Sequence, residues 1–264
     1  MKVIGRLSTR RRHPLAAFVV VLLALGMVGA LYATFAPSGS AEAASGPKSL
    51  AIQEGKGLFI TSCSTCHGLN AEGSSDGPPL IGVGAAAVDF QVGTGRMPAQ
   101  SKEAQEPRKQ VFFNSDEASA LAAYVGSLAP GPAIPTSDQY ATDGDLQEGG
   151  QIFRTNCASC HNFAGDGGAL TYGKYAVGLQ ATTPKHMYEA MLTGPQAMPI
   201  FNDGALTPAQ KKDVVTYLAR MQKQPDPGGN ALGRLGPVTE GLLLWTIVLG
   251  ALIGVAVWLG AKAK

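Results

Sequence analysis

The feature that most constrains this chain is a short segment that occurs twice. EGKGLFITSCSTCHG at residues 54–68 aligns without a gap with EGGQIFRTNCASCHN at residues 148–162. The offset is constant at 94 residues (148 − 54), and all four cysteines of the chain fall in the two Cys-x-x-Cys-His motifs. A gapless repeat of this kind predicts two tandem domains of the same fold.

Three kinds of site compete for these cysteines. A zinc site needs four ligands, and one motif supplies only three, although the two copies could pool theirs. A redox dithiol gives no reason for a histidine after the second cysteine in both copies. Haem attachment accounts for every position, because the thiols bond to the vinyl groups and the histidine binds iron. The sequence therefore predicts two covalently bound haem c groups, held by Cys63, Cys66 and His67 in the first copy and by Cys157, Cys160 and His161 in the second.

Two methionines are the predicted second axial ligands of the iron. Met97 lies in GTGRMPAQ and Met198 in GPQAMPIF, each before a proline in a loop downstream of a motif. A thioether ligand raises the haem potential and closes the iron to small molecules. The rivals Met187 and Met191 are four residues apart in a predicted helix, so we expect them to line one helix face. His186 is expected to be a surface or supporting residue.

The start of the chain is basic and then apolar. Residues 1–14 hold five Lys or Arg, and Leu15 to Phe35 is a run of 21 uncharged residues. A run of this length can span the bilayer core, so we predict a retained transmembrane helix. A cleaved secretory signal is the alternative, because AEA at 41–43 offers a cleavage site. Both interpretations place the rest of the chain outside the cytoplasm.

The end of the chain contains a second uncharged stretch, at residues 241–260. Trp245 and Trp258 lie near its two ends, as interfacial aromatic residues do. A membrane span is predicted, with a buried core helix as the alternative. Because basic residues flank the outer ends of both spans, both termini are predicted to be cytoplasmic in a multi-pass protein of the cell membrane.

The predicted fold is mainly α, with two cytochrome c-like domains between two transmembrane helices. Residues 45–230 carry 13 basic and 17 acidic side chains, a net charge of 13 − 17 = −4, which argues against nucleic-acid binding. Proline- and glycine-rich segments suggest the boundaries. The predicted division is 1–36, basic arm and N-terminal helix or signal; 48–129, first domain; 130–144, linker; 145–224, second domain; 225–240, hinge; and 241–261, C-terminal helix.

Each half resembles the class I cytochrome c fold. The resemblance is based on Gly55-x-x-x-Phe59 before the motif, GPPLIGVG at 77–84 and Tyr124 in a last helix. The resemblance implies that the first and last helices cross, that Gly55 permits their close approach and that Phe59 and Tyr124 pack nearby. The corresponding residues of the second half are Gly149, Phe153 and Tyr217. The GPPL stretch is expected to line the haem edge. The second half lacks it, so its haem-edge loop is expected to be built differently.

The whole chain resembles the dihaem cytochrome c subunits of actinobacterial cytochrome bc complexes. The resemblance is based on the order in which its membrane spans, haem motifs and Met-Pro loops follow one another. The resemblance implies the electron-transfer subunit of a quinol–cytochrome c reductase, a translocase, with no independent catalysis in this chain. It implies electron transfer from the Rieske iron–sulfur subunit to the copper-containing subunit of a cytochrome c oxidase, with a cytochrome b subunit and membrane lipid as further partners. The alternatives are a dihaem subunit of a cbb-type oxidase and a stand-alone dihaem oxidoreductase with one open iron.

Overall fold

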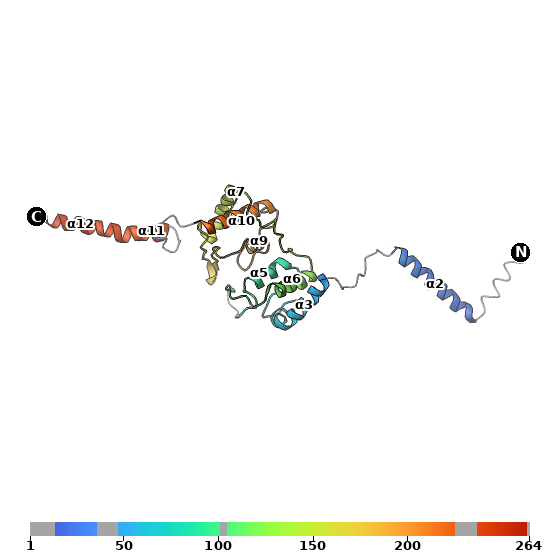
Figure 1. The fold of residues 1–264 in the computed structure, drawn as a ribbon. Coiled ribbons are helices and arrows are strands. Elements are labelled where there is room, and N and C mark those ends of the chain that lie inside the picture. The colour runs from blue at the N-terminus through green and yellow to red at the C-terminus, as the bar shows by residue number, and fades with distance from the viewer. Residues whose placement is uncertain (1–13, 36–46, 101–104, 225–236, 263–264) are drawn as a thin grey trace. The chain divides into compact units, whose positions relative to one another are not determined.

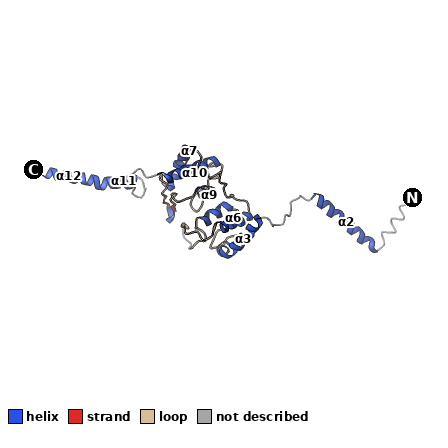
Figure 2. Ribbon diagram, in the orientation of Figure 1, coloured by secondary structure: helices blue, strands red, loops and turns tan. Residues whose placement is uncertain are grey.

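The structure, a computed structural model, describes residues 14–35, 47–100, 105–224 and 237–262 (Figure 1). The chain divides into one unit of residues 1–46 and a second of residues 47–264. Helices make up most of the described chain, with only short strands (Figure 2). Most of the predicted basic arm, the predicted cleavage site at 41–43 and much of the predicted hinge lie outside the described residues.

The first half of the second unit is built around two helices that meet at a glycine. Its helices are α3 (Pro47–Ser62), α4 (Ser64–His67), α5 (Ala85–Gly93) and α6 (Ser115–Leu128). A Cβ atom on Gly55 in α3 would overlap the carbonyl oxygen of Ala120 in α6. The rings of Phe59 and Tyr124 pack beside this contact, with centroids 5.3 Å apart. The expected close approach of the first and last helices is confirmed.

Local sequence signals set where α6 begins. Asn114 accepts hydrogen bonds from the backbone N–H groups of Asp116 and Glu117, and the Glu117 side chain accepts one from the Asn114 N–H. This reciprocal capping box satisfies backbone donors that the first helical turn leaves free. α6 therefore begins at Ser115, with Asn114 as its cap.

The second half repeats this arrangement. Its elements are α7 (Leu146–Ile152), η1 (Phe153–Cys157), α8 (Ala158–His161), β1 (Gly168–Ala169), η2 (Thr171–Gly173), β2 (Tyr175–Ala176), α9 (Pro184–Thr193) and α10 (Pro208–Lys223). A Cβ atom on Gly149 would overlap the carbonyl oxygen of Asp213 in α10, and Phe153 packs 5.5 Å from Tyr217. A capping box formed by Thr207 and Gln210 begins α10.

Each half has its own hydrophobic core, and the segment between the halves is bonded to both. One cluster of buried side chains surrounds Phe59, and a separate one surrounds Phe153. Pro132 accepts a hydrogen bond from the backbone N–H of Ala86, and the Gly144 N–H donates to the Thr216 hydroxyl. α5 and α9 also pack against each other. Residues 130–144 therefore connect two halves that share an interface.

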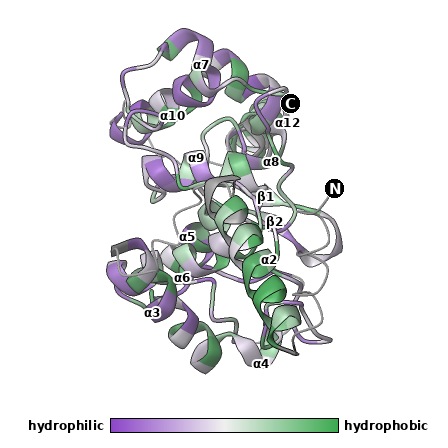
Figure 3. Ribbon diagram, turned by 90° about the vertical axis from the view of Figure 1, so that its right-hand side faces the viewer, coloured by the Kyte–Doolittle hydropathy of each residue, from purple (hydrophilic) through white to green (hydrophobic). Residues whose placement is uncertain are grey.

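The C-terminal helix comprises α11 (Pro237–Leu243), η4 (Leu244–Val248) and α12 (Leu249–Lys262). Over 24 residues, Thr239–Lys262, it is long and apolar enough to cross a membrane. The N-terminal helix α2 (Pro14–Phe35) is apolar along most of its length (Figure 3), but the apolar part with described side chains, Leu15–Leu31, is shorter. The described residues thus support one membrane-spanning helix, and the N-terminal one stays a prediction.

Candidate haem sites

The last four residues of each Cys-x-x-Cys-His motif form a short helix, which follows α3 in the first half and η1 in the second. All four cysteines are free thiols, with the first of each pair partly buried and the second exposed. Burial, followed by the neighbouring cysteine, raises the pKa of both Cys63 and Cys157 to about 11. Redox dithiols depend on a lowered thiol pKa. Cys63 and Cys157 are therefore poorly suited to start disulfide exchange, and pairs of thiols at this spacing fit thioether attachment.

Both motif histidines are oriented by a backbone carbonyl. His67 Nδ1 lies 2.7 Å from the Pro78 oxygen, and His161 Nδ1 lies 2.9 Å from the Val177 oxygen. A carbonyl can only accept, so each Nδ1 carries the proton and each Nε2 presents its lone pair to a metal. Burial lowers the pKa of His161, which keeps that ring in the neutral form that binds iron.

The contact between His161 and the Val177 carbonyl was not indicated by the sequence. Gly73 N–H donates to the His67 carbonyl, and Gly167 N–H to the His161 carbonyl, so both loops leave the motif in the same way. The orienting carbonyl then follows 11 residues after His67 but 16 after His161, an insertion of 16 − 11 = 5 residues. The antiparallel β1–β2 hairpin lies in this lengthened segment. The second haem-edge loop is thus longer than the first and forms a hairpin.

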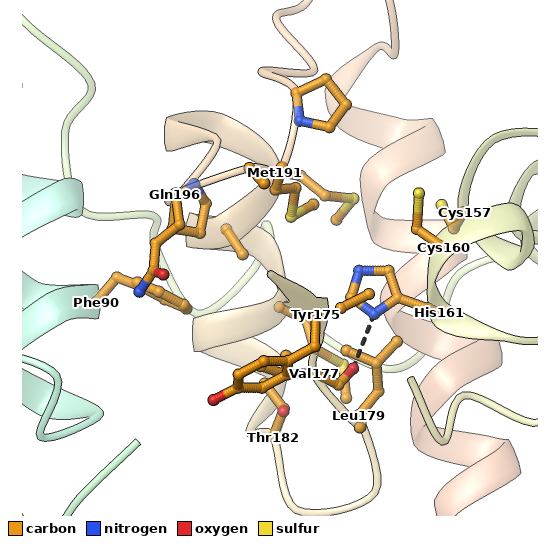
Figure 4. A pocket seen from close by; sticks show the side chains of 18 of the residues that line it. Phe90, Cys157, Cys160, His161, Tyr175, Val177, Leu179, Thr182, Met191 and Gln196 are labelled. Carbon is orange, nitrogen blue, oxygen red and sulfur yellow. Dashed lines mark hydrogen bonds between the residues drawn. The ribbon is translucent and has the colours of Figure 1, made fainter. Parts of the chain in front are cut away.

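A cavity in the second half gathers the predicted haem residues. Cys157, Cys160, His161 and Met198 all line it, and the labelled side chains show the cysteines and His161 on one side (Figure 4). The rest of the wall is largely apolar, with Leu179, Phe201, Val214 and Leu218 among its side chains. Free thiols, a histidine with an available Nε2 and an apolar wall fit a covalently held porphyrin.

Three thioethers reach this cavity. Met187 and Met191 lie on α9 and are buried in the core, as expected for residues four apart on one helix face. Both nevertheless line the cavity, together with the half-buried Met198 in the loop after α9. The choice of Met198 as the axial ligand stays a prediction, which a substitution series tests below.

In the first half, the predicted haem-binding residues lie beside one hydrophobic core. Cys63, Leu80 and Met97 are partly buried and pack against the cluster that contains Phe59. Pro78, from the GPPL stretch, supplies the carbonyl to His67, and His67 is itself buried. The expectation that this stretch borders the haem site agrees with these contacts.

The zinc alternative finds no support at the motifs. Within the described residues, one group of three His, Cys, Asp or Glu ligand atoms lies within 4.8 Å, and it consists of Asp89, His186 and Glu189. Lys185 Nζ already contacts Asp89 Oδ2 at 2.6 Å and supplies a cation there. We call these four residues the interdomain cluster, because Asp89 lies on α5 and the others on α9. His186 packs edge-on against Phe90, so it is a supporting residue, as expected.

Glu189 makes the interdomain cluster sensitive to pH. Burial, then hydrogen bonding to and repulsion by Asp89, raises the pKa of Glu189 to about 9. Unfolding therefore releases a proton between the unfolded pKa, about 4.5, and about 9, so stability falls as pH rises through this window. Glu189→Gln keeps the size of the side chain and removes the titration. We expect it to stabilise the protein by about 1–3 kcal/mol at pH 8, with little gain at pH 5.

Thermal unfolding of the intact protein between pH 5 and 9 measures this effect. The matched control is Glu54→Gln, an exposed carboxyl on α3, which should leave the pH profile unchanged. A Glu189→Gln variant whose melting temperature follows the parental pH profile would contradict a buried, protonated Glu189.

Comparisons with known proteins agree with two cytochrome domains. Residues 52–129 match the family model "Cytochrome c", and residues 144–218 match "Cytochrome C oxidase, cbb3-type, subunit III". The cytochrome bc1 complex cytochrome c subunit of Mycobacterium tuberculosis is 44% identical over 98% of this chain and 95% of its own length. That of Corynebacterium diphtheriae is 40% identical over 98% of both chains. The cbb3-type cytochrome c oxidase subunit FixP of Bradyrhizobium diazoefficiens is 31% identical over 45% of this chain and 41% of its own length.

Proposed function

Because this chain belongs to the family of cytochrome bc1 complex cytochrome c subunits, we propose that it is the dihaem electron relay of a menaquinol/quinol–cytochrome c reductase. In this proposal it accepts electrons from the Rieske iron–sulfur subunit and delivers them to the copper-containing subunit of a cytochrome c oxidase. The observation that carries the proposal is the duplicated site, with paired free thiols and a carbonyl-oriented histidine in each half.

The side chains around each site have separate tasks. A bound haem would supply reversible one-electron chemistry at its iron. The cysteine pairs would hold it covalently, and the carbonyls of Pro78 and Val177 keep each histidine Nε2 available for a metal. Met97 and Met198 would supply a thioether ligand to each haem. A haem held by a histidine and a thioether would be closed to substrates, so we propose electron transfer and no separate catalysis for this chain.

We propose that the membrane anchors keep this relay close to its electron donor and acceptor. We propose that the domains at 48–129 and 145–224 lie on the extracytoplasmic side, with the spans near both termini in the membrane and both ends cytoplasmic. An anchored relay stays near its electron donor and acceptor, so a high effective concentration replaces a diffusible carrier.

A subunit of a cbb-type oxidase is the second candidate, because the second half matches the cbb3-type family model. The relative of that type covers under half of this chain, whereas the bc1 relatives cover nearly all of it. A stand-alone dihaem oxidoreductase would need one open iron. Optical spectra of the purified protein separate the relay from a stand-alone enzyme: two low-spin haems support the relay, and a haem that is high-spin or binds carbon monoxide supports an enzyme.

Deletion of residues 241–264 tests the complex and the anchor together. We expect the shortened chain to lose the cytochrome b and Rieske subunits on purification in mild detergent, and quinol-driven oxygen uptake to fall at least tenfold, because the relay loses its high effective concentration. The control replaces 241–260 with an unrelated apolar segment of the same length. A shortened chain that still purifies with its partners and turns over normally would contradict the structural role of this helix.

A further inference from the structure

The cavity of the second half is closed by residues of the first. Phe90 on α5, Arg96 in the loop after it and Arg108 all line the cavity that holds Cys157 and Cys160. The close-up shows Phe90 across the cavity from the two cysteines (Figure 4). The first half therefore forms the wall that faces the thiols.

Hydrogen bonds across the interface hold this wall in place. The Gln105 side chain donates to the Tyr175 carbonyl at 2.8 Å and accepts from the Tyr175 N–H at 2.9 Å. Arg108 Nη1 donates to the Ala181 carbonyl at 2.9 Å. Tyr175 belongs to the β1–β2 hairpin, so the lengthened segment of the second haem-edge loop also binds the first half.

Two guanidinium groups in this wall have no carboxylate partner among the described residues. Arg96 is only 6% exposed, its Nη1 donates to the Thr94 hydroxyl at 2.6 Å, and its Cζ lies 4.9 Å from the Phe90 ring centroid. Of the carboxylates in the described ranges, none forms an ion pair with Arg96 or Arg108. A buried cation without an anion is costly, so this wall is suited to an anionic ligand.

The chemistry of haem identifies that ligand. The two thioether carbons and the two propionates lie on opposite halves of the porphyrin, so attachment at the cysteines directs the propionates toward the facing wall. Guanidinium groups bind carboxylates through paired, charge-assisted hydrogen bonds. We propose that Arg96 and Arg108 bind the propionates of the haem attached to Cys157 and Cys160, so that the first half completes the haem site of the second.

This proposal rests on the proposed haem of the second half. It also places Arg96 between the two haem sites. Its side chain lines the second site, and its peptide continues into Met97, the predicted ligand of the first iron. One short segment would therefore fix the two sites relative to each other. Arg96 and Arg108 are positioning residues that also set the charge around the second haem.

Redox titration of the intact protein tests the proposal. Without a guanidinium partner, a propionate charge favours the oxidised, more positive iron, so Arg96→Gln and Arg108→Gln should lower the potential of the second haem. We expect its reduced-to-oxidised ratio at a fixed applied potential to fall about tenfold, the size of a lost charge-assisted hydrogen bond. Arg96→Lys keeps the charge and should restore most of the ratio. Arg154→Gln removes an exposed cation outside the cavity and is the matched control.

The two haems are told apart by repeating the titration in a Met97→Leu background, which moves the first haem. Unchanged potentials in both glutamine variants, or a shift confined to the first haem, would overturn the proposal. Arg108 is exposed, so its variant keeps the test valid if Arg96→Gln fails to fold. A parent protein with one haem per chain would instead overturn the dihaem function, which separates the two failures.

Discussion

Replacement of Met97 or Met198 by leucine is expected to lower the midpoint potential of one haem by on the order of 0.1 V or more. Leucine keeps the apolar volume and removes the sulfur, so the iron loses a ligand that favours its reduced form. Axial ligands spread haem potentials over about 0.8 V, which makes this shift large. Electron transfer from quinol to oxygen should slow strongly, because the altered haem becomes a poor acceptor.

The comparison among the three cavity methionines decides the ligand of the second iron. Met187→Leu and Met191→Leu are the matched controls, since both residues line the same cavity from the buried face of α9. We expect these two variants to keep both potentials and both low-spin spectra. If Met191→Leu shifts a potential and Met198→Leu does not, the axial assignment moves to α9.

Gly55→Ala is expected to destabilise the first half by about 3 kcal/mol or more. The added Cβ would overlap the Ala120 carbonyl oxygen, which belongs to the backbone of α6 and cannot rotate away. The helices must separate, and the Phe59–Tyr124 contact opens with them. Haem content and the melting temperature of the purified protein both measure the loss.

The same helix offers a matched control for this substitution. Gly57 has no atom within 4 Å of an added Cβ, so Gly57→Ala meets no steric obstacle. Alanine restricts the unfolded chain, and we expect a gain of about 0.5–1 kcal/mol. Equal behaviour of the two variants would show that the close approach at Gly55 does not limit stability. Gly149→Ala should repeat the loss in the second half.

Helices and their caps could be predicted from the sequence because their determinants are local. The capping box of Thr207 and Gln210 and the face shared by Met187 and Met191 depend on spacings of three or four residues. The close approach at Gly55 and Gly149 was expected from the family resemblance, since local pattern gives no partner for a glycine. The surroundings of His186 were not predictable in detail, because Asp89 reaches it from the other half of the chain.

By itself, the sequence determined the chemistry of this protein: two Cys-x-x-Cys-His motifs at a constant offset predict haem, and the order of spans and motifs indicates the family. Only the tertiary structure decided which carbonyl orients His161, because a backbone oxygen such as that of Val177 has no signature in the residue type. It also decided that Arg96 and Arg108 face the second cavity. A cavity wall is formed by residues that are distant along the chain, and only the packing of α5 against α9 brings them to the same place.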